Sequence, residues 1–272
     1  MSDWVDRIDS LAEEALRATG STAIRPIYGG LFGAVILVHF EDQRRVLKLF
    51  PLEKATLGQI DALEKMHGNG CPAVYAADRD RGWVLLEEIA DNLPSDELVD
   101  LEQAYQAISK IWAAPLSAYQ LTYLDMFNFW FEIHGTASPA DLLTAIKRAR
   151  QLIGQAPASE LTHIHADIGV HNLMRRSSGE MIFIDPSGAL GPPAVDLGAL
   201  GAWGGAARVE SLNNALRLAE IAGVDPLEPA RWAVVSIIAD ANMCHSRGDA
   251  DQRRECLSAA KILLDQFDDL QK

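Results

Sequence analysis

The sequence has few cysteines: Cys71, Cys244 and Cys256 lie far apart along its 272 residues. An odd number of widely spaced cysteines excludes the disulfide framework that holds many small secreted domains together. For the same reason we expect no zinc site built from thiolates. A reducing cytoplasm is the expected location of the chain.

The sequence also lacks any apolar run near the roughly 18 residues that a membrane-spanning helix needs. Its opening stretch, MSDWVDRIDSLAEEALRATG, has neither the basic nor the apolar region of a signal peptide. We therefore expect no signal peptide and no membrane as a partner.

Positive charge is in deficit, with 24 Lys and Arg against 38 Asp and Glu, for a net charge of −14. A nucleic-acid partner requires a basic surface, so the composition argues against one. An acidic protein attracts small cationic substrates, although many cytoplasmic proteins are acidic for solubility alone.

The composition is that of an ordinary globular protein, 49% hydrophobic and 23% charged. The chain is long enough for two lobes with their own cores. Apolar residues at helical spacing predict a helix over residues 3–19, and Gly20 ends it. Short runs rich in β-branched and aromatic residues, separated by turn residues, then predict strands. The predicted strands are 22–28, 34–40, 44–50, 73–78 and 83–89, with one helix at 55–66 between them.

Beyond residue 90 the pattern becomes helical. The predicted helices are 97–114, 116–134, 139–155, 193–204, 207–222, 227–247 and 251–269, with a strand at 180–185. The sequence therefore predicts an α+β fold with a small β-rich N-lobe and a larger helical C-lobe.

The segment HIHADIGVHN, residues 163–172, allows two chemical interpretations. In the first, His163 and His165 share one face of a strand and bind zinc together with Asp167. The metallo-hydrolase motif that this resembles has a histidine where this chain has Ile168. A motif without its confirming context is weak, so we rank the zinc site low.

In the second interpretation the same segment is H-x-D-x4-N, formed by His165, Asp167 and Asn172, and Asp185 follows thirteen positions later. This is the order of a kinase catalytic loop and its metal-binding aspartate. Asp167 would accept the proton of a substrate hydroxyl. Asn172 and Asp185 would offer oxygen ligands to Mg²⁺ beside the phosphates of ATP.

The upstream half supplies the other parts of a kinase site in the expected order. Gly29, Gly30 and Gly33 lie in a hairpin loop that lets backbone N–H groups approach phosphates. Lys48 lies in an apolar strand, as does the lysine that binds the α- and β-phosphates. The last strand leads into a hinge whose backbone could pair with adenine, formed by Glu87, Glu88, Ile89 and Ala90, with the glutamate side chains in solvent.

Two segments carry a specific resemblance: IHADIGVHNLM and IFIDPSGALGPPAVDLGAL. They resemble the catalytic loop and the metal segment of the aminoglycoside phosphotransferase family, closest to the streptomycin 6-phosphotransferase and hydroxyurea phosphotransferase groups. The resemblance implies a bilobal protein-kinase-like fold. Residues 1–90 would form the N-lobe with the glycine loop and the phosphate lysine, and residues 91–272 the C-lobe with the catalytic loop and the acceptor site.

The resemblance also implies roles for individual residues. Asp167 matches the catalytic aspartate, Asn172 and Asp185 match the Mg²⁺ ligands, and Lys48 matches the phosphate lysine. His165 and Asp196 match residues that brace the catalytic loop.

Three positions depart from the family pattern. Ala166 stands where the family has glycine, and a methyl group is tolerated there if φ is negative. His171 precedes Asn172 and would face either the acceptor or solvent. The helix glutamate that holds the lysine is replaced by Gln59, with Asp61 nearby.

The implied activity is ATP- and Mg²⁺-dependent phosphorylation of a hydroxyl on a small molecule, such as streptomycin or another cationic aminoglycoside. The alternatives are a kinase of another metabolite, such as a sugar or an amino alcohol, and a nucleotide-binding pseudokinase. The chain would act as a monomer or a homodimer.

Overall fold

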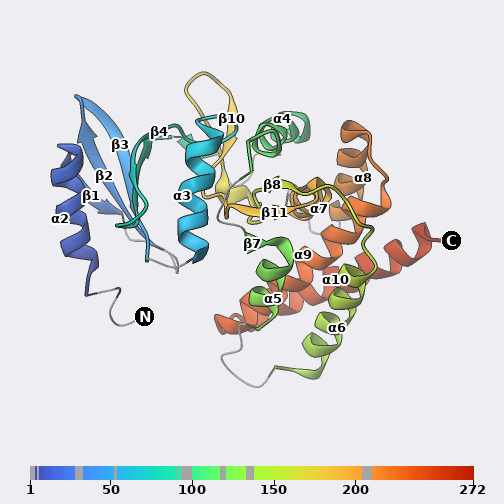
Figure 1. The fold of residues 1–272 in the computed structure, drawn as a ribbon. Coiled ribbons are helices and arrows are strands. Elements are labelled where there is room, and N and C mark those ends of the chain that lie inside the picture. Colours follow the sequence, from blue (N-terminus) through green and yellow to red (C-terminus); the bar gives the residue numbers. More distant parts are fainter. Residues whose placement is uncertain are drawn as a thin grey trace.

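The computed structural model describes residues 4, 6–27, 33–51, 54–89, 91–92, 100–116, 121–132, 138–203 and 210–272. Figure 1 shows a small β-sheet flanked by two helices on one side of the molecule and a larger helical part on the other. The prediction of an α+β, kinase-like architecture is confirmed by this arrangement. None of the described helices is long and apolar enough to span a membrane.

The first part of the chain forms an antiparallel sheet of five strands in the order β1-β2-β3-β5-β4. Its strands are β1 (Thr22–Ile27), β2 (Ala34–Phe40), β3 (Gln43–Leu49), β4 (Val74–Asp78) and β5 (Trp83–Glu87). Helix α2 (Ile8–Thr19) lies against one face and helix α3 (Lys54–Met66) against the other (Figure 1).

Strand β3 shows why the sheet needs both helices. Successive side chains of a strand point to opposite faces. Leu47 and Leu49 pack with α2, whereas Val46 and Phe50 pack on the side of α3. Lys48 shares this second face, so the alternation turns a cationic side chain toward the rest of the molecule.

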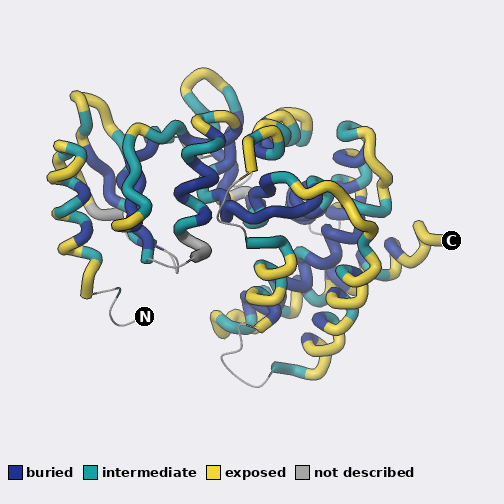
Figure 2. Tube along the Cα trace, viewed as in Figure 1, coloured by how far each residue is buried: buried dark blue, intermediate teal, exposed yellow. Residues whose placement is uncertain are grey.

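The second part is built around α9 (Leu227–Ser246), a largely buried helix. Its neighbours are α6 (Ala140–Gly154), α7 (Pro193–Trp203), α8 (Ser211–Ala222) and α10 (Ala250–Leu270), and α4 (Leu101–Trp112) and α5 (Tyr123–Glu132) complete the helices described here. Figure 2 shows buried residues in the interior of the molecule and exposed residues on the outer side of α2.

Two small sheets connect these helices to the site. One contains β6 (Asp91–Asn92), β9 (Leu173–Arg175) and β10 (Met181–Phe183), and the other contains β7 (Leu121–Thr122), β8 (Thr162–Ile164) and β11 (Ala189–Gly191). A 3₁₀ turn, Val170–Asn172, precedes β9. The sequence did not predict most of these strands, since two or three residues are too few to show a period.

Helix boundaries differ modestly from the predicted ones. The helix predicted from 116 begins at Tyr123, after strand β7. Helix α4 begins at Leu101, where the Asp100 side chain accepts hydrogen bonds from the backbone N–H groups of Glu102 and Gln103. This N-cap satisfies donors that the first helical turn leaves without partners.

The two parts of the molecule touch closely at Gly188. This residue has φ of +69°, and a Cβ placed on it would lie 2.4 Å from the carbonyl oxygen of Gly58 on α3. Backbone therefore meets backbone between helix α3 and the loop that follows Asp185. Only glycine allows both the conformation and the approach.

Replacing Gly188 with alanine should destabilise the protein more than the same change at Gly179. Gly179 also has positive φ, +88°, but has no atom within 4 Å of the added methyl group. Gly179→Ala should cost about 1–2 kcal/mol for the left-handed conformation. Gly188→Ala should cost about 1–3 kcal/mol more through overpacking against α3. Chemical denaturation measures both, and equal losses would contradict the close contact.

Candidate active site

A buried carboxylate holds the candidate catalytic loop, residues 163–172. Asp196, on α7, is fully buried and accepts three hydrogen bonds. Its Oδ2 accepts from the backbone N–H of His165 (2.8 Å) and from Trp112 Nε1 (3.0 Å), and its Oδ1 accepts from the N–H of Ala166 (2.9 Å). Burial raises the pKa of Asp196, and these donors act against that shift. The carboxylate thus determines where the backbone before Asp167 runs.

Ala166 adopts a left-handed conformation. Its φ is +59°, so the condition of a negative φ, under which a methyl group is tolerated at this position, is not met. A left-handed conformation costs a non-glycine residue about 1–2 kcal/mol. The hydrogen bond from its N–H to Asp196 is one of the contacts that hold it there.

Asn172 and Asp167 are joined directly. Asn172 is 5% exposed, and its Nδ2 donates to the backbone oxygen of Asp167 (2.8 Å) and to Asp167 Oδ2 (3.2 Å). The amide orientation therefore leaves Asn172 Oδ1 and Asp167 Oδ1 as the oxygens available to a ligand.

Asp185 follows β10 and is brought beside Asn172 by strand pairing. Phe183 pairs with Leu173, and the N–H of Ile184 donates to the carbonyl oxygen of Asn172 (2.8 Å). Asp185 also has a left-handed backbone, with φ of +59°. Its side chain therefore turns away from the direction that the strand would give it.

His165 links the catalytic loop to this turn. Its Nε2 lies 2.8 Å from the carbonyl oxygen of Ile184, and its Nδ1 lies 3.3 Å from the N–H of Asp167. With Nδ1 accepting, Nε2 carries the proton and donates. The N–H of Ser187 donates to the His165 carbonyl oxygen (2.9 Å), and the ring contacts Phe183 edge-on.

Lys48 reaches across to Asp185. Its Nζ lies 2.7 Å from Asp185 Oδ1 and 4.9 Å from the centre of the Phe50 ring. The Lys48 side chain is 9% exposed and that of Asp185 44% exposed. Residues 137 positions apart in sequence therefore form one charged pair between the sheet and the segment that follows β10.

Neither of the two helix residues expected to partner Lys48 binds it in the structure. The Asp61 carboxylate is buried and pairs with Arg79 through its Oδ1 (2.7 Å). Gln59 Oε1 is buried and has no hydrogen-bond partner among the described residues. Asp185 is therefore the residue that pairs with Lys48, in place of Gln59 or Asp61.

The glycine loop is described only at Gly33, because Gly29 and Gly30 lie outside the described residues. A Cβ on Gly33 would lie 2.4 Å from the carbonyl oxygen of Leu49. The close approach of β2 to the end of β3 is therefore a structural reason for this glycine.

The hinge holds a contact that the sequence did not reveal. The Glu87 carboxylate binds Arg176 (2.7 Å), which also donates to the carbonyl oxygens of Gly68 and Cys71. The hydrogen bonds with Glu87 are the main cause of the raised pKa of Arg176. Arg176 follows β9, far from Glu87 in sequence, so no local pattern indicates the pair.

The expectation that both glutamate side chains lie in solvent is wrong, because each carboxylate is paired and the side chains of Glu87 and Glu88 are only 24% and 17% exposed. The backbone N–H of Glu87 donates to Ala73 (2.8 Å), so this donor is used inside the fold. Glu88 pairs with Arg44, Ile89 follows it, and Ala90 lies outside the described residues.

The histidines of the zinc alternative have other partners. His163 is fully buried, and its Nε2 lies 2.8 Å from the Pro115 carbonyl oxygen. Burial lowers its pKa, as expected for a histidine in the core. His165 Nε2 faces Ile184, so the two rings do not converge on one ligand.

A pocket of about 660 Å³ opens beside the catalytic loop. Asp167, His171, Asn172 and Asp185 are among its lining residues. Aromatic residues from α5 and α7 also line it, namely Tyr123, Phe127, Phe129, Trp130 and Trp203. The described charged lining residues are four aspartates (Asp167, Asp185, Asp240 and Asp249) and one arginine, Arg247, so the pocket is acidic.

The chain belongs to the phosphotransferase enzyme family, whose sequence model matches residues 23–232. This match confirms the predicted family and the predicted class, a kinase of small molecules. No curated protein matches the chain in sequence.

Solved structures share the fold at low sequence identity. The choline kinase LicA from Streptococcus pneumoniae has a TM-score of 0.69 at 15% identity, covering 94% of this chain and 98% of that chain. The aminoglycoside phosphotransferase APH(4)-Ia has 0.64 at 14%, with the same coverage. A choline/ethanolamine kinase family protein from Mesorhizobium loti has 0.63 at 14%, covering 93% and 95%.

Replacing Asp196 with asparagine should loosen the catalytic loop. One carboxylate oxygen would become an NH₂ group facing an N–H donor, which should cost about 1–3 kcal/mol for a buried donor without a partner. Trp112→Phe is the matched control, because it removes one donor and keeps an aromatic ring. It should cost about 0.5–1.5 kcal/mol. An Asp196→Asn variant as stable as the wild type in chemical denaturation would contradict this role of the carboxylate.

Proposed function

We propose that this protein transfers the γ-phosphate of ATP to a hydroxyl group of a small cationic molecule. One observation carries the proposal: Asp167, Asn172 and Asp185 all line the acidic pocket, and Lys48 reaches Asp185 from the sheet. These are the residue types, in the chain order, that phosphoryl transfer uses.

Asp167 is the proposed catalytic base. Its Oδ2 accepts from Asn172, which leaves Oδ1 for the hydroxyl of an acceptor in the pocket. The carboxylate would take the hydroxyl proton and direct the oxygen at the γ-phosphorus. Asp196 and His165 position this base, since their side chains accept hydrogen bonds from the backbone N–H groups of residues 165–167.

Asn172 and Asp185 fit Mg²⁺ by their chemistry. Asn172 uses its amide nitrogen on Asp167 and keeps an amide oxygen, and Asp185 has a second carboxylate oxygen beyond the one that binds Lys48. Both are hard oxygen ligands of the kind that Mg²⁺ prefers. Bound there, Mg²⁺ would neutralise charge on the phosphates.

Lys48 is proposed to bind the phosphates of ATP. Its ammonium group is nearly buried and faces the pocket residue Asp185, so an incoming phosphate would compete for the same donor. A thermostable mutant of APH(4)-Ia was solved in a ternary complex with ADP and hygromycin B, which supports ATP as the donor and a small molecule as the acceptor.

The pocket favours a cationic acceptor. Its aspartates outnumber its arginine, and a carboxylate-rich cleft concentrates cations. An aminoglycoside such as streptomycin carries several positive groups and fits this charge. A volume of about 660 Å³ lies within the range of about 300–1,000 Å³ for small-molecule sites.

The aromatic wall supports a second candidate, an amino alcohol. Tyr123, Phe127 and Trp130 present ring surfaces to the pocket, and such surfaces attract ammonium groups through cation–π interactions. The likeness to LicA, described as a choline kinase, supports this candidate.

ATP turnover with a panel of acceptors tests the proposal. The purified protein with Mg²⁺ should phosphorylate a cationic alcohol from a panel of streptomycin, hygromycin B, choline and neutral sugars. Asp167→Ala should reduce turnover by about 10²–10⁴-fold, because a positioned base is lost. ATP affinity should change little, since Asp167 does not bind the nucleotide.

Asp269→Ala provides the matched control. Asp269 is an exposed aspartate near the C-terminus that pairs with Lys272, and its replacement should leave turnover unchanged. Phosphorylation of neutral sugars alone would contradict the cationic acceptor. Nucleotide binding without turnover on any acceptor would instead indicate a pseudokinase.

A further inference from the structure

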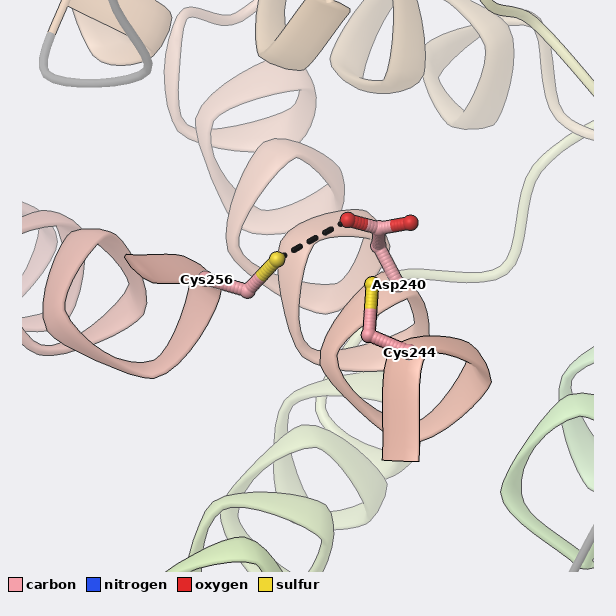
Figure 3. Close-up of side chains that lie close together, drawn as sticks. All are labelled: Asp240, Cys244 and Cys256. Atoms are coloured by element: carbon pink, nitrogen blue, oxygen red, sulfur yellow. Dashed lines mark hydrogen bonds between the residues drawn. The ribbon is translucent and has the colours of Figure 1, made fainter. Parts of the chain in front are cut away.

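Two of the three cysteines lie together with an aspartate between the last two helices. Asp240 and Cys244 are one turn apart on α9, and Cys256 faces them from α10 (Figure 3). The ligand atoms of the three side chains all lie within 4.8 Å of one another. Cys244 and Cys256 are buried, and Asp240 is partly buried.

The cluster already contains a short polar contact. Cys256 Sγ lies 2.9 Å from Asp240 Oδ2 and donates its proton to that oxygen, as the dashed line in Figure 3 marks. The carboxylate and the two thiols can together supply three anionic ligands, because thiols bind metals as thiolates.

We propose that Asp240, Cys244 and Cys256 form a binding site for a thiophilic divalent cation of the zinc class. On binding, each thiol releases its proton to solvent, and two thiolates and one carboxylate then coordinate the ion. Two sulfur ligands and one oxygen ligand suit Zn²⁺, whereas Mg²⁺ prefers oxygen ligands alone. The site is therefore distinct in chemistry from Asn172 and Asp185.

The distances require little movement. Tetrahedral zinc with Zn–S of about 2.3 Å and Zn–O of about 2.1 Å places sulfur about 3.6 Å from oxygen. The present 2.9 Å contact is shorter than this and the 4.8 Å limit is longer, so small side-chain rotations are enough.

The site would be open on one side. Asp240 and Cys244 line the acidic pocket, whereas Cys256 lies behind them on α10. Three protein ligands leave one tetrahedral position, which the pocket can fill with water or with a donor atom of a bound molecule. The ion would also fix α10 to α9 at the wall of this pocket.

The expectation of no thiolate site rested on the distances between cysteines along the chain. Cys244 and Cys256 lie on either side of the turn between α9 and α10, so the fold brings together residues that no short motif connects. Cys71 remains apart, and burial raises the pKa of its thiol to about 12. It therefore serves as the control cysteine.

Titration of the metal-free protein with CoCl₂, with Mg²⁺ in excess to occupy sites made of oxygen ligands, tests the proposal. The wild type and Cys71→Ser should bind one Co²⁺ and show a thiolate-to-cobalt charge-transfer band in the near ultraviolet. Loss of a residue that only hydrogen-bonds to a metal ligand weakens metal binding by roughly 10–100-fold. Cys244→Ser and Cys256→Ser each remove a proposed ligand, so each should weaken Co²⁺ binding by at least that much. Asp240→Asn should weaken it while the band remains.

X-ray absorption of the zinc-loaded wild type makes the test independent of the variants. It should show sulfur ligands at about 2.3 Å from zinc. A coordination sphere of nitrogen and oxygen alone would overturn the proposal. The proposal is equally overturned if the wild type gives no cobalt band, or if Cys256→Ser and Cys71→Ser bind Co²⁺ equally well.

Discussion

The ion pair between Lys48 and Asp185 is the contact on which the arrangement of the site depends. A lysine ammonium is costly to bury unless an anion accompanies it, and the strand that carries Lys48 supplies apolar neighbours. The anion comes from a loop 137 residues further along the chain. The pair therefore joins the small sheet to the segment that follows β10. In the proposed reaction, a phosphate of ATP would compete with Asp185 for Lys48, and the carboxylate would then be available to a cation.

The two segments that carry Asp167 and Asp185 each contain a residue in an unfavourable backbone conformation. Ala166 and Asp185 both have φ of +59°, which side chains other than glycine adopt at a cost. The fully buried Asp196 holds the first of them through its N–H, and His165 bonds to the backbone on either side of the loop. The buried hydrogen bonds to Asp196 therefore fix the backbone just before Asp167. A rigid carboxylate that lines the pocket suits the proposed role of Asp167 as proton acceptor.

The sequence predicted the local parts well, because they depend on short-range patterns. Short runs rich in β-branched and aromatic residues predicted β2 and the strand of Lys48, and the order of His165, Asp167, Asn172 and Asp185 indicated the chemistry. Contacts between segments that are distant in sequence were either not predicted or predicted wrongly. The Glu87–Arg176 pair and the cysteine cluster of α9 and α10 join residues that no spacing relates. Such contacts follow only from how the elements pack, which the sequence period does not encode.

A crystal structure with Mg²⁺ and AMP-PNP tests the proposed phosphoryl-transfer site most directly. We expect a metal at about 2.0–2.1 Å from oxygens of Asn172 and Asp185. Lys48 Nζ should bond a phosphate oxygen, with the γ-phosphate directed toward Asp167. A nucleotide bound away from these residues would contradict the proposed site. So would a metal held by other ligands while Lys48 contacts no phosphate.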